Sequence, residues 1–110
     1  MIKKNLQELI KEYRESILNT AHLYKANNIQ VFGSVARGDY DENSDIDFLV
    51  SFSDDAGLYD LIGLKQALQE LFGCSVDIAT PDSLKARIRE RVLSEAKAIW
   101  EMIKKNYLIF

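Results

Sequence analysis

Apolar residues recur every three or four positions in two long stretches, and this spacing predicts amphipathic helices. The first helix is expected over roughly residues 5–26, with a break near Asn19-Thr20. The polar pair Asn27-Asn28 is a plausible stop for it. The second helix is expected from Leu58 to Phe72, and Gly73 follows it where a C-terminal capping glycine belongs.

Shorter apolar runs between the helical stretches predict three strands. We expect strands over Ile29–Phe32, Asp45–Phe52 and Ser75–Thr80, each bounded by residues that favour turns. One helical turn is expected at Ser34–Arg37, after the first strand. The apolar stripe that runs from Ile88 to Ile103 predicts a final helix that frays into the polar residues after it.

The order of these elements is helix, strand, strand, helix, strand, helix. It predicts an α/β (α+β) fold in which a small mixed sheet carries helices on one face. The opposite face must then be open, covered by a partner or used for chemistry. A length of 110 residues fits one domain spanning 1–110.

Composition narrows the class of protein without naming a function. The net charge of -3 argues against binding nucleic acid by neutralising phosphates, although local charge can differ from the total. Cys74 is the one cysteine, so no disulfide framework can form within the chain. The N-terminal segment has no secretory apolar core, and no apolar run approaches membrane-spanning length. The expected compartment is the cytoplasm.

Three aspartates occupy the predicted strands on the side away from the helices. Side chains alternate across a strand, so Asp45 and Asp47 share one face while Ile46 and Phe48 face the helices. The Cα atoms of the two aspartates are expected about 7 Å apart, because a strand rises ~3.3 Å per residue. The same alternation turns Asp77 outward in the third strand. If the two strands are neighbours, three carboxylates converge on one patch.

Clustered carboxylates repel one another, and binding hard cations is the usual resolution. Mg²⁺ prefers oxygen ligands and typically combines protein carboxylates with substrate phosphates. Two such ions about 3.5–4 Å apart can stabilise both oxygens of an in-line displacement at phosphorus. The competing interpretation is a solvated strand surface, because a D-x-D sequence alone is common.

Gly33-Ser34 directly follows a predicted strand and opens the predicted helical turn. A glycine lets the backbone approach a ligand closely, and free N–H groups at a helix start can bind phosphate. Arg37, one turn later, could meet a phosphate or a carboxylate. The plainer interpretation is a turn in which Gly33 permits positive φ and Ser34 caps a helix.

Taken together, these features carry a family resemblance. Gly33-Ser34, ten intervening residues and then Asp45-Ile46-Asp47 match the G-S-x10-D-x-D signature of the DNA polymerase β-type nucleotidyltransferase superfamily. The string GSVARGDYDENSDIDFLV resembles that of the minimal nucleotidyltransferases, the MNT proteins. The resemblance is strongest over residues 29–50, and it extends through Asp77 to the run Ile88–Val92.

The resemblance implies a role for each motif residue. Asp45 and Asp47 would ligate the catalytic and the nucleotide-bound Mg²⁺ ions. Asp77 would complete the catalytic metal site and help to activate the attacking hydroxyl. Gly33 and Ser34 would hold the β and γ phosphates of ATP. Arg37 is the weaker carry-over, because its contact could be structural.

The resemblance also implies a partner. Small MNT proteins are typically encoded with a helical HEPN protein in a toxin–antitoxin pair, in which the MNT protein is the antitoxin. The chain is similar to enzymes that transfer AMP from ATP to a tyrosine of the toxin, a type VII-like antitoxin activity. A chain of this length has no room for a second substrate-binding domain, so we expect another protein to present the acceptor.

Two other functions stay open at this point. The chain could neutralise its partner by covering it without chemistry, and Trp100 and the apolar tail Tyr107–Phe110 are candidate contact residues. It could instead modify a small molecule such as an antibiotic, with a homo-oligomer supplying the missing walls. The sequence leaves the acceptor, the nucleotide preference and the oligomeric state undetermined.

Overall fold

The computed structural model describes residues 5–84 and 86–98 of the chain. The C-terminal part of the predicted last helix, Trp100 and the tail Tyr107–Phe110 lie outside these residues. In chain order the elements are α1 (Leu6–Glu12), α2 (Arg14–Leu23), β1 (Ala26–Phe32), α3 (Gly33–Arg37), β2 (Ile46–Phe52), α4 (Leu58–Phe72), β3 (Val76–Ala79), the 3₁₀ turn η1 (Pro81–Ser83), α5 (Ala86–Glu95) and β4 (Lys97–Ala98).

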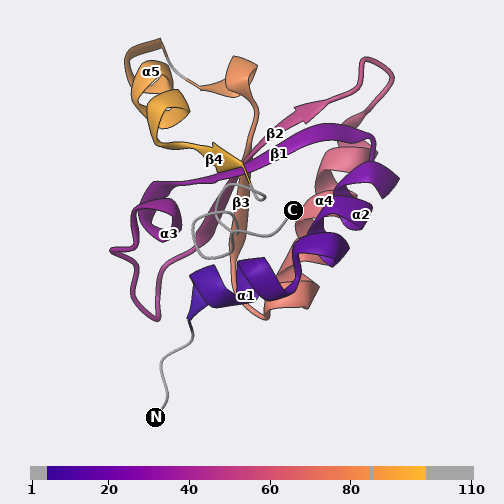
Figure 1. Ribbon diagram of the computed structural model, residues 1–110. Helices are drawn as coiled ribbons and strands as arrows, with labels where there is room; N and C mark the ends of the chain where they lie inside the picture. The colour runs from indigo at the N-terminus through magenta and orange to yellow at the C-terminus, as the bar shows by residue number, and fades with distance from the viewer. Residues whose placement is uncertain (1–4, 85, 99–110) are drawn as a thin grey trace, which may run out of the picture.

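The strands form a mixed sheet in the order β3-β2-β1-β4 (Figure 1). β1 runs antiparallel to β2 and to β4, whereas β3 runs parallel to β2. A parallel pair needs a crossover connection, and α4 provides it between β2 and β3. The predicted fold class, a small mixed sheet with helices packed on it, is confirmed.

Helices α1, α2 and α4 cover one face of the sheet. Alternation in β2 turns Ile46, Phe48 and Val50 toward these helices, and all three are buried. Phe72 from α4 packs against Phe48, with ring centroids 6.3 Å apart. The continuous core on this side consists of Leu6, Ile10, Ile17, Ala21, Ala26, Ile29, Val31, Val35, Ala36, Ile46, Phe48, Val50, Leu64, Leu68, Phe72 and Val76.

The opposite face of the sheet is partly covered near its centre. Leu49 points away from the main core, and yet it is only 2% exposed. Val92 of α5 is also buried outside that core. α5 contacts α3 and β1 and lies apart from α2 and α4 (Figure 1). Asp45, just before β2, and Asp77, on β3, are exposed.

The predicted N-terminal helix is correct in type and wrong in its break and its end. The break lies at Tyr13 rather than near Asn19-Thr20, and the Tyr13 ring packs edge-on against Phe72 at 5.8 Å. The helix stops at Leu23 because Lys25 adopts a left-handed φ of 64°. The pair Asn27-Asn28 belongs to β1, where Asn28 pairs with Ser51 of β2 after a register shift that follows Ala26, and both asparagine side chains are exposed.

The predicted final helix also ends earlier than its apolar stripe suggests. α5 stops at Glu95, and Lys97–Ala98 then pairs with Gln30 and Val31 of β1 as the short strand β4. None of the helices in the described part of the chain is both long enough and apolar enough to span a bilayer.

Candidate active site

Gly33 lies at the point where β1 ends and α3 begins, directly beside Asp47. The antiparallel register of β1 and β2 places Phe32 opposite Asp47, so the next residue turns across the end of that pair. Gly33 has a φ of 74°, which residues with a Cβ rarely adopt. A Cβ built on Gly33 would lie 3.2 Å from Asp47 Cγ and closer still to Oδ2. The backbone at Gly33 and the Asp47 carboxylate therefore share a space that only glycine leaves free.

Asp77 lies directly opposite Asp47 on the neighbouring strand. The parallel register pairs Ile46 with Val76 and Asp47 with Asp77. The sequence left the pairing of these two strands as a condition, and the structure meets it. Adjacent strands are about 4.8 Å apart. Asp45 lies just before β2, which starts at Ile46 instead of the predicted Asp45. Asp45 and Asp77 are exposed, and Asp47 between them is half-buried.

The electrostatics of Asp47 indicate that the three carboxylates act on one another. Burial, followed by the negative charges of Asp77 and Asp45, raises the pKa of Asp47 to about 6. The positive charge of Arg37 opposes this rise in the pKa. A cation bound beside these three carboxylates would offset their mutual repulsion and stabilise the ionised form of Asp47.

Arg37 lies at the C-terminal end of α3 and is exposed. Its Nε forms an ion pair of 3.1 Å with Asp39 Oδ2. The sequence allowed a phosphate or a carboxylate as the partner of Arg37, and the structure provides a carboxylate. Because its charge also lowers the pKa of Asp47, Arg37 contributes to the field of the site from its edge.

Ser34 occupies the first turn of α3, and backbone hydrogen bonds close this turn. The Ser34 carbonyl accepts hydrogen bonds from the amides of Gly38, at 2.8 Å, and Asp39, at 3.1 Å. Gly38 ends α3 with a left-handed φ of 90°. The predicted helical turn is thus confirmed, one residue longer at its start, and it presents Gly33 next to Asp47.

Comparison with known proteins identifies the family. The model of the nucleotidyltransferase domain matches residues 7–99. This chain belongs to the nucleotidyltransferase domain family. It is 37% identical over 87 residues to a protein of Methanocaldococcus jannaschii assigned as a protein adenylyltransferase, covering 79% of this chain and 94% of that protein. It is 41% identical over 87 residues to the protein adenylyltransferase MntA of Thermococcus cleftensis, covering 74% and 87%.

Solved structures agree with this family assignment. A protein assigned as a minimal nucleotidyltransferase superposes with a TM-score of 0.75 at 43% identity, covering 83% of this chain and 93% of that one. More distant likenesses share the fold alone. They include a toxin–antitoxin structure with AMP-PNP (23% identity, TM-score 0.65, covering 83% and 84%) and a tri-AMPylated HEPN toxin in complex with MNT antitoxin from Shewanella oneidensis (21%, 0.60, covering 90% and 77%).

The nucleotidyltransferase offers donors that suit a hard cation shared with phosphate. Oxygen ligands are what Mg²⁺ prefers, and Asp47 has two carboxylate neighbours that raise its pKa. Within residues 5–84 and 86–98, no group of three or more His, Cys, Asp or Glu side chains is placed so that it could hold a metal ion.

The structure adds residues to the nucleotidyltransferase site that spacing alone does not mark. Phe32 is half-buried on the face of Asp47 and is its register partner. Side chains alternate along the first predicted strand, so Phe32 lies on the other face of the sheet from Val31. The position of Phe32 on the aspartate face could therefore have been found from the sequence. Gln7 of α1 donates a hydrogen bond to α3, and Tyr40 in the loop after α3 is hydrogen-bonded to the start of α1; neither residue stands out by pattern or motif.

Proposed function

We propose that this nucleotidyltransferase uses Mg²⁺ to transfer AMP from ATP to a hydroxyl of a partner protein, a tyrosine of a cognate HEPN toxin, and thereby acts as an antitoxin. The observation that carries the proposal is the junction of Gly33 with Asp47, opposite Asp77. It combines a backbone turn suited to phosphate with carboxylates suited to a cation in one place.

Each residue of the junction has a role in this proposal. The acceptor hydroxyl oxygen forms a bond to the α-phosphorus of ATP, the bond to the β-phosphate oxygen breaks, and pyrophosphate leaves. Asp45, Asp47 and Asp77 would hold two Mg²⁺ ions, which neutralise the phosphates and the developing charge. Asp77 would also take part in removing the hydroxyl proton. Gly33 and Ser34 would orient the β and γ phosphates through their backbone amides.

A protein acceptor is favoured by two observations. The relatives with 37% and 41% identity carry the name protein adenylyltransferase. The described surface also keeps large apolar side chains exposed on the contacting helices α2 and α4, where Leu23 is 72%, Leu58 69% and Tyr59 80% exposed. Apolar side chains of this size suit contact with another protein.

The test is the intact mass of the proposed HEPN partner, after incubation with this protein, ATP and Mg²⁺. Additions of AMP size are expected, with tyrosine as the modified residue in peptide mapping. D45N and D47N should each abolish the additions, because each removes a carboxylate charge from the site. D54N is the matched control, since Asp54 is an exposed aspartate of the β2–α4 loop.

Neutralisation without chemistry is the outcome that would refute the enzymatic account. A D45N/D47N double variant that still neutralises the partner, with no mass added by the parent protein, would identify a binding antitoxin. AMP transfer to an antibiotic in the absence of any partner would refute the protein acceptor alone.

A further inference from the structure

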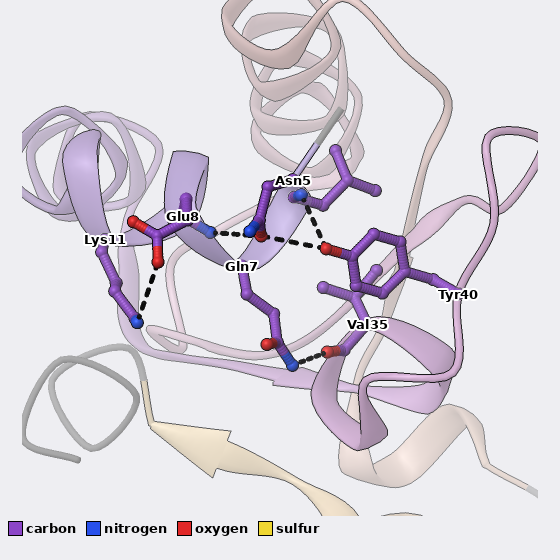
Figure 2. A network of polar contacts seen from close by, with 7 residues as sticks. Asn5, Gln7, Glu8, Lys11, Val35 and Tyr40 are labelled. Atoms are coloured by element: carbon purple, nitrogen blue, oxygen red, sulfur yellow. Dashed lines mark hydrogen bonds and ion pairs between the residues drawn. The ribbon is translucent and has the colours of Figure 1, made fainter. Parts of the chain in front are cut away.

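The side chain of Gln7 links α1 to α3. Its Nε2 donates a hydrogen bond of 2.8 Å to the backbone carbonyl of Val35 (Figure 2). α3 is one turn long, and the carbonyls at the end of a helix lack partners within it. The Ser34 carbonyl is satisfied by the amides that follow α3, and the Val35 carbonyl is satisfied by Gln7. The orientation of the turn that presents Ser34 is therefore set partly from α1.

Tyr40 forms a second link, from the loop between α3 and β2 back to the same end of α1 (Figure 2). Its hydroxyl accepts a hydrogen bond of 3.1 Å from the Leu6 amide and donates one of 3.0 Å to Asn5 Oδ1. Asn5 Oδ1 also caps α1 by accepting from the Glu8 amide at 3.0 Å. The N-terminal cap of α1 is thus completed by a residue of the loop that leads to Asp45.

We propose that Gln7 and Tyr40 are positioning residues for the nucleotide, which hold the segment 33–45 at its helix and at its loop. A helix of one turn is not stable by itself, so its geometry must come from neighbours. A phosphate site costs less to occupy when its backbone amides are already oriented. The inference rests on the proposed function, because it gives the segment a nucleotide to bind.

The packing of α3 distinguishes positioning from simple stability. Val35 and Ala36 are buried and anchor α3 to the core without either hydrogen bond. The two links are polar, and the side chains that make them, Gln7 and Tyr40, are half-buried. Loss of a link should consequently change the orientation and mobility of the segment more than the overall stability of the fold.

The test uses Q7M, which keeps the length of the side chain without the donor, and Y40F, which removes the hydroxyl alone. E8Q is the matched control, because Glu8 lies in the same turn and its side chain pairs with Lys11 at 3.5 Å. We measure the Kd for ATP with Mg²⁺, the melting temperature without nucleotide and the amide hydrogen exchange of residues 33–45. Loss of one hydrogen bond should weaken ATP binding about three- to tenfold.

The inference predicts weaker ATP binding and faster exchange at 33–45 in Q7M and Y40F, with E8Q close to the parent. Unchanged ATP affinity in both variants, measured well below their melting temperatures, overturns it. If the parent protein does not bind ATP with Mg²⁺, the proposed function is refuted. The hydrogen-exchange data then test separately whether Gln7 and Tyr40 position the segment 33–45. Equal exchange at 33–45 in Q7M, Y40F and E8Q then refutes the positioning.

Discussion

Asp77 lies directly across from Asp47 in the parallel pairing of β3 with β2, and Gly33 closes the space on the other side of Asp47. Elements from three parts of the chain therefore meet at one carboxylate. Burial and the neighbouring negative charges raise the pKa of Asp47 to about 6, so the ionised form of Asp47 is disfavoured in the absence of a cation.

Replacing Gly33 by alanine should damage the site more than the fold. The new Cβ would collide with the Asp47 carboxylate, and a φ of 74° costs a residue with a Cβ about 1–2 kcal/mol. G57A is the control, because a Cβ at Gly57 meets nothing within 4 Å and the backbone there is extended. We expect G33A to lose ATP binding at least tenfold while G57A retains it. Equal affinities would show that the Gly33–Asp47 contact is unimportant for the nucleotide.

The raised pKa of Asp47 predicts a specific dependence of stability on pH. Between pH 3.8 and about 6 the folded protein holds more protons at Asp47 than the unfolded chain does, so stability falls as pH rises through this window. D47N removes this loss. In metal-free buffer at pH 7.5 it should stabilise the protein by about 1–2 kcal/mol, below the limit of about 3 kcal/mol set by the shift, since solvent screens this half-buried group.

The measurement is chemical denaturation of the parent and D47N at several pH values, with D54N as the control. The gain from D47N should shrink as pH falls through this window and approach zero only below about pH 3, where Asp47 of the parent is protonated in both the folded and the unfolded state. A gain that does not change with pH would mean that the asparagine acts through packing and not through charge.

Addition of ATP and Mg²⁺ should reverse the order of stability. A ligand bound only by the folded state raises stability by ~2.7 kcal/mol at a hundredfold excess over Kd. The parent should gain this, whereas D45N, D47N and D77N should gain little. Thermal unfolding with and without ATP and Mg²⁺ measures the difference. If ATP and Mg²⁺ raise the melting temperature of D77N as much as that of the parent, Asp77 does not take part in holding the metal.

Gly63 in α4 should tolerate alanine only when Tyr24 is also changed. A Cβ at Gly63 would meet the Tyr24 ring, with Cδ1 at 2.8 Å and Cζ at 2.9 Å. The steric cost, about 1–3 kcal/mol, should outweigh the gain of about 1 kcal/mol in helix propensity. In a Y24A background the same substitution should be neutral or stabilising. A double-mutant cycle by denaturation tests this, and equal effects of G63A in both backgrounds would contradict the contact.

The site could be predicted from the sequence because its signals are local. The alternation of side chains around Asp47 and the glycine before Ser34 can each be recognised from a few consecutive residues. The structure has this strand and this turn where they were expected. The pairing that brings Asp77 opposite Asp47 is confirmed, although it depends on contacts that no single window contains. The roles of these residues in binding metal and nucleotide stay predictions.

Other features of the fold could not be predicted, for physical reasons. The turn after α2 places a lysine, Lys25, at positive φ, and no glycine marks it. Asn27-Asn28 forms part of a strand because Ala26 and Asn28 on either side of a register shift both pair with β2, whereas the polar side chains suggested a helix end. The strand β4 is two residues long, and its pairing with β1 overrides the helical periodicity that continues beyond Glu95.

The most direct test of the central claim is the fate of two labels on ATP. The purified HEPN partner is incubated with this protein, Mg²⁺ and ATP that carries a radioactive phosphorus at either the α or the γ position. The account predicts that the α label enters the partner and that the γ label leaves as pyrophosphate. With D45N, no label should enter the partner and no labelled pyrophosphate should form. Entry of the γ label into the partner, or no entry of the α label under these conditions, would contradict it.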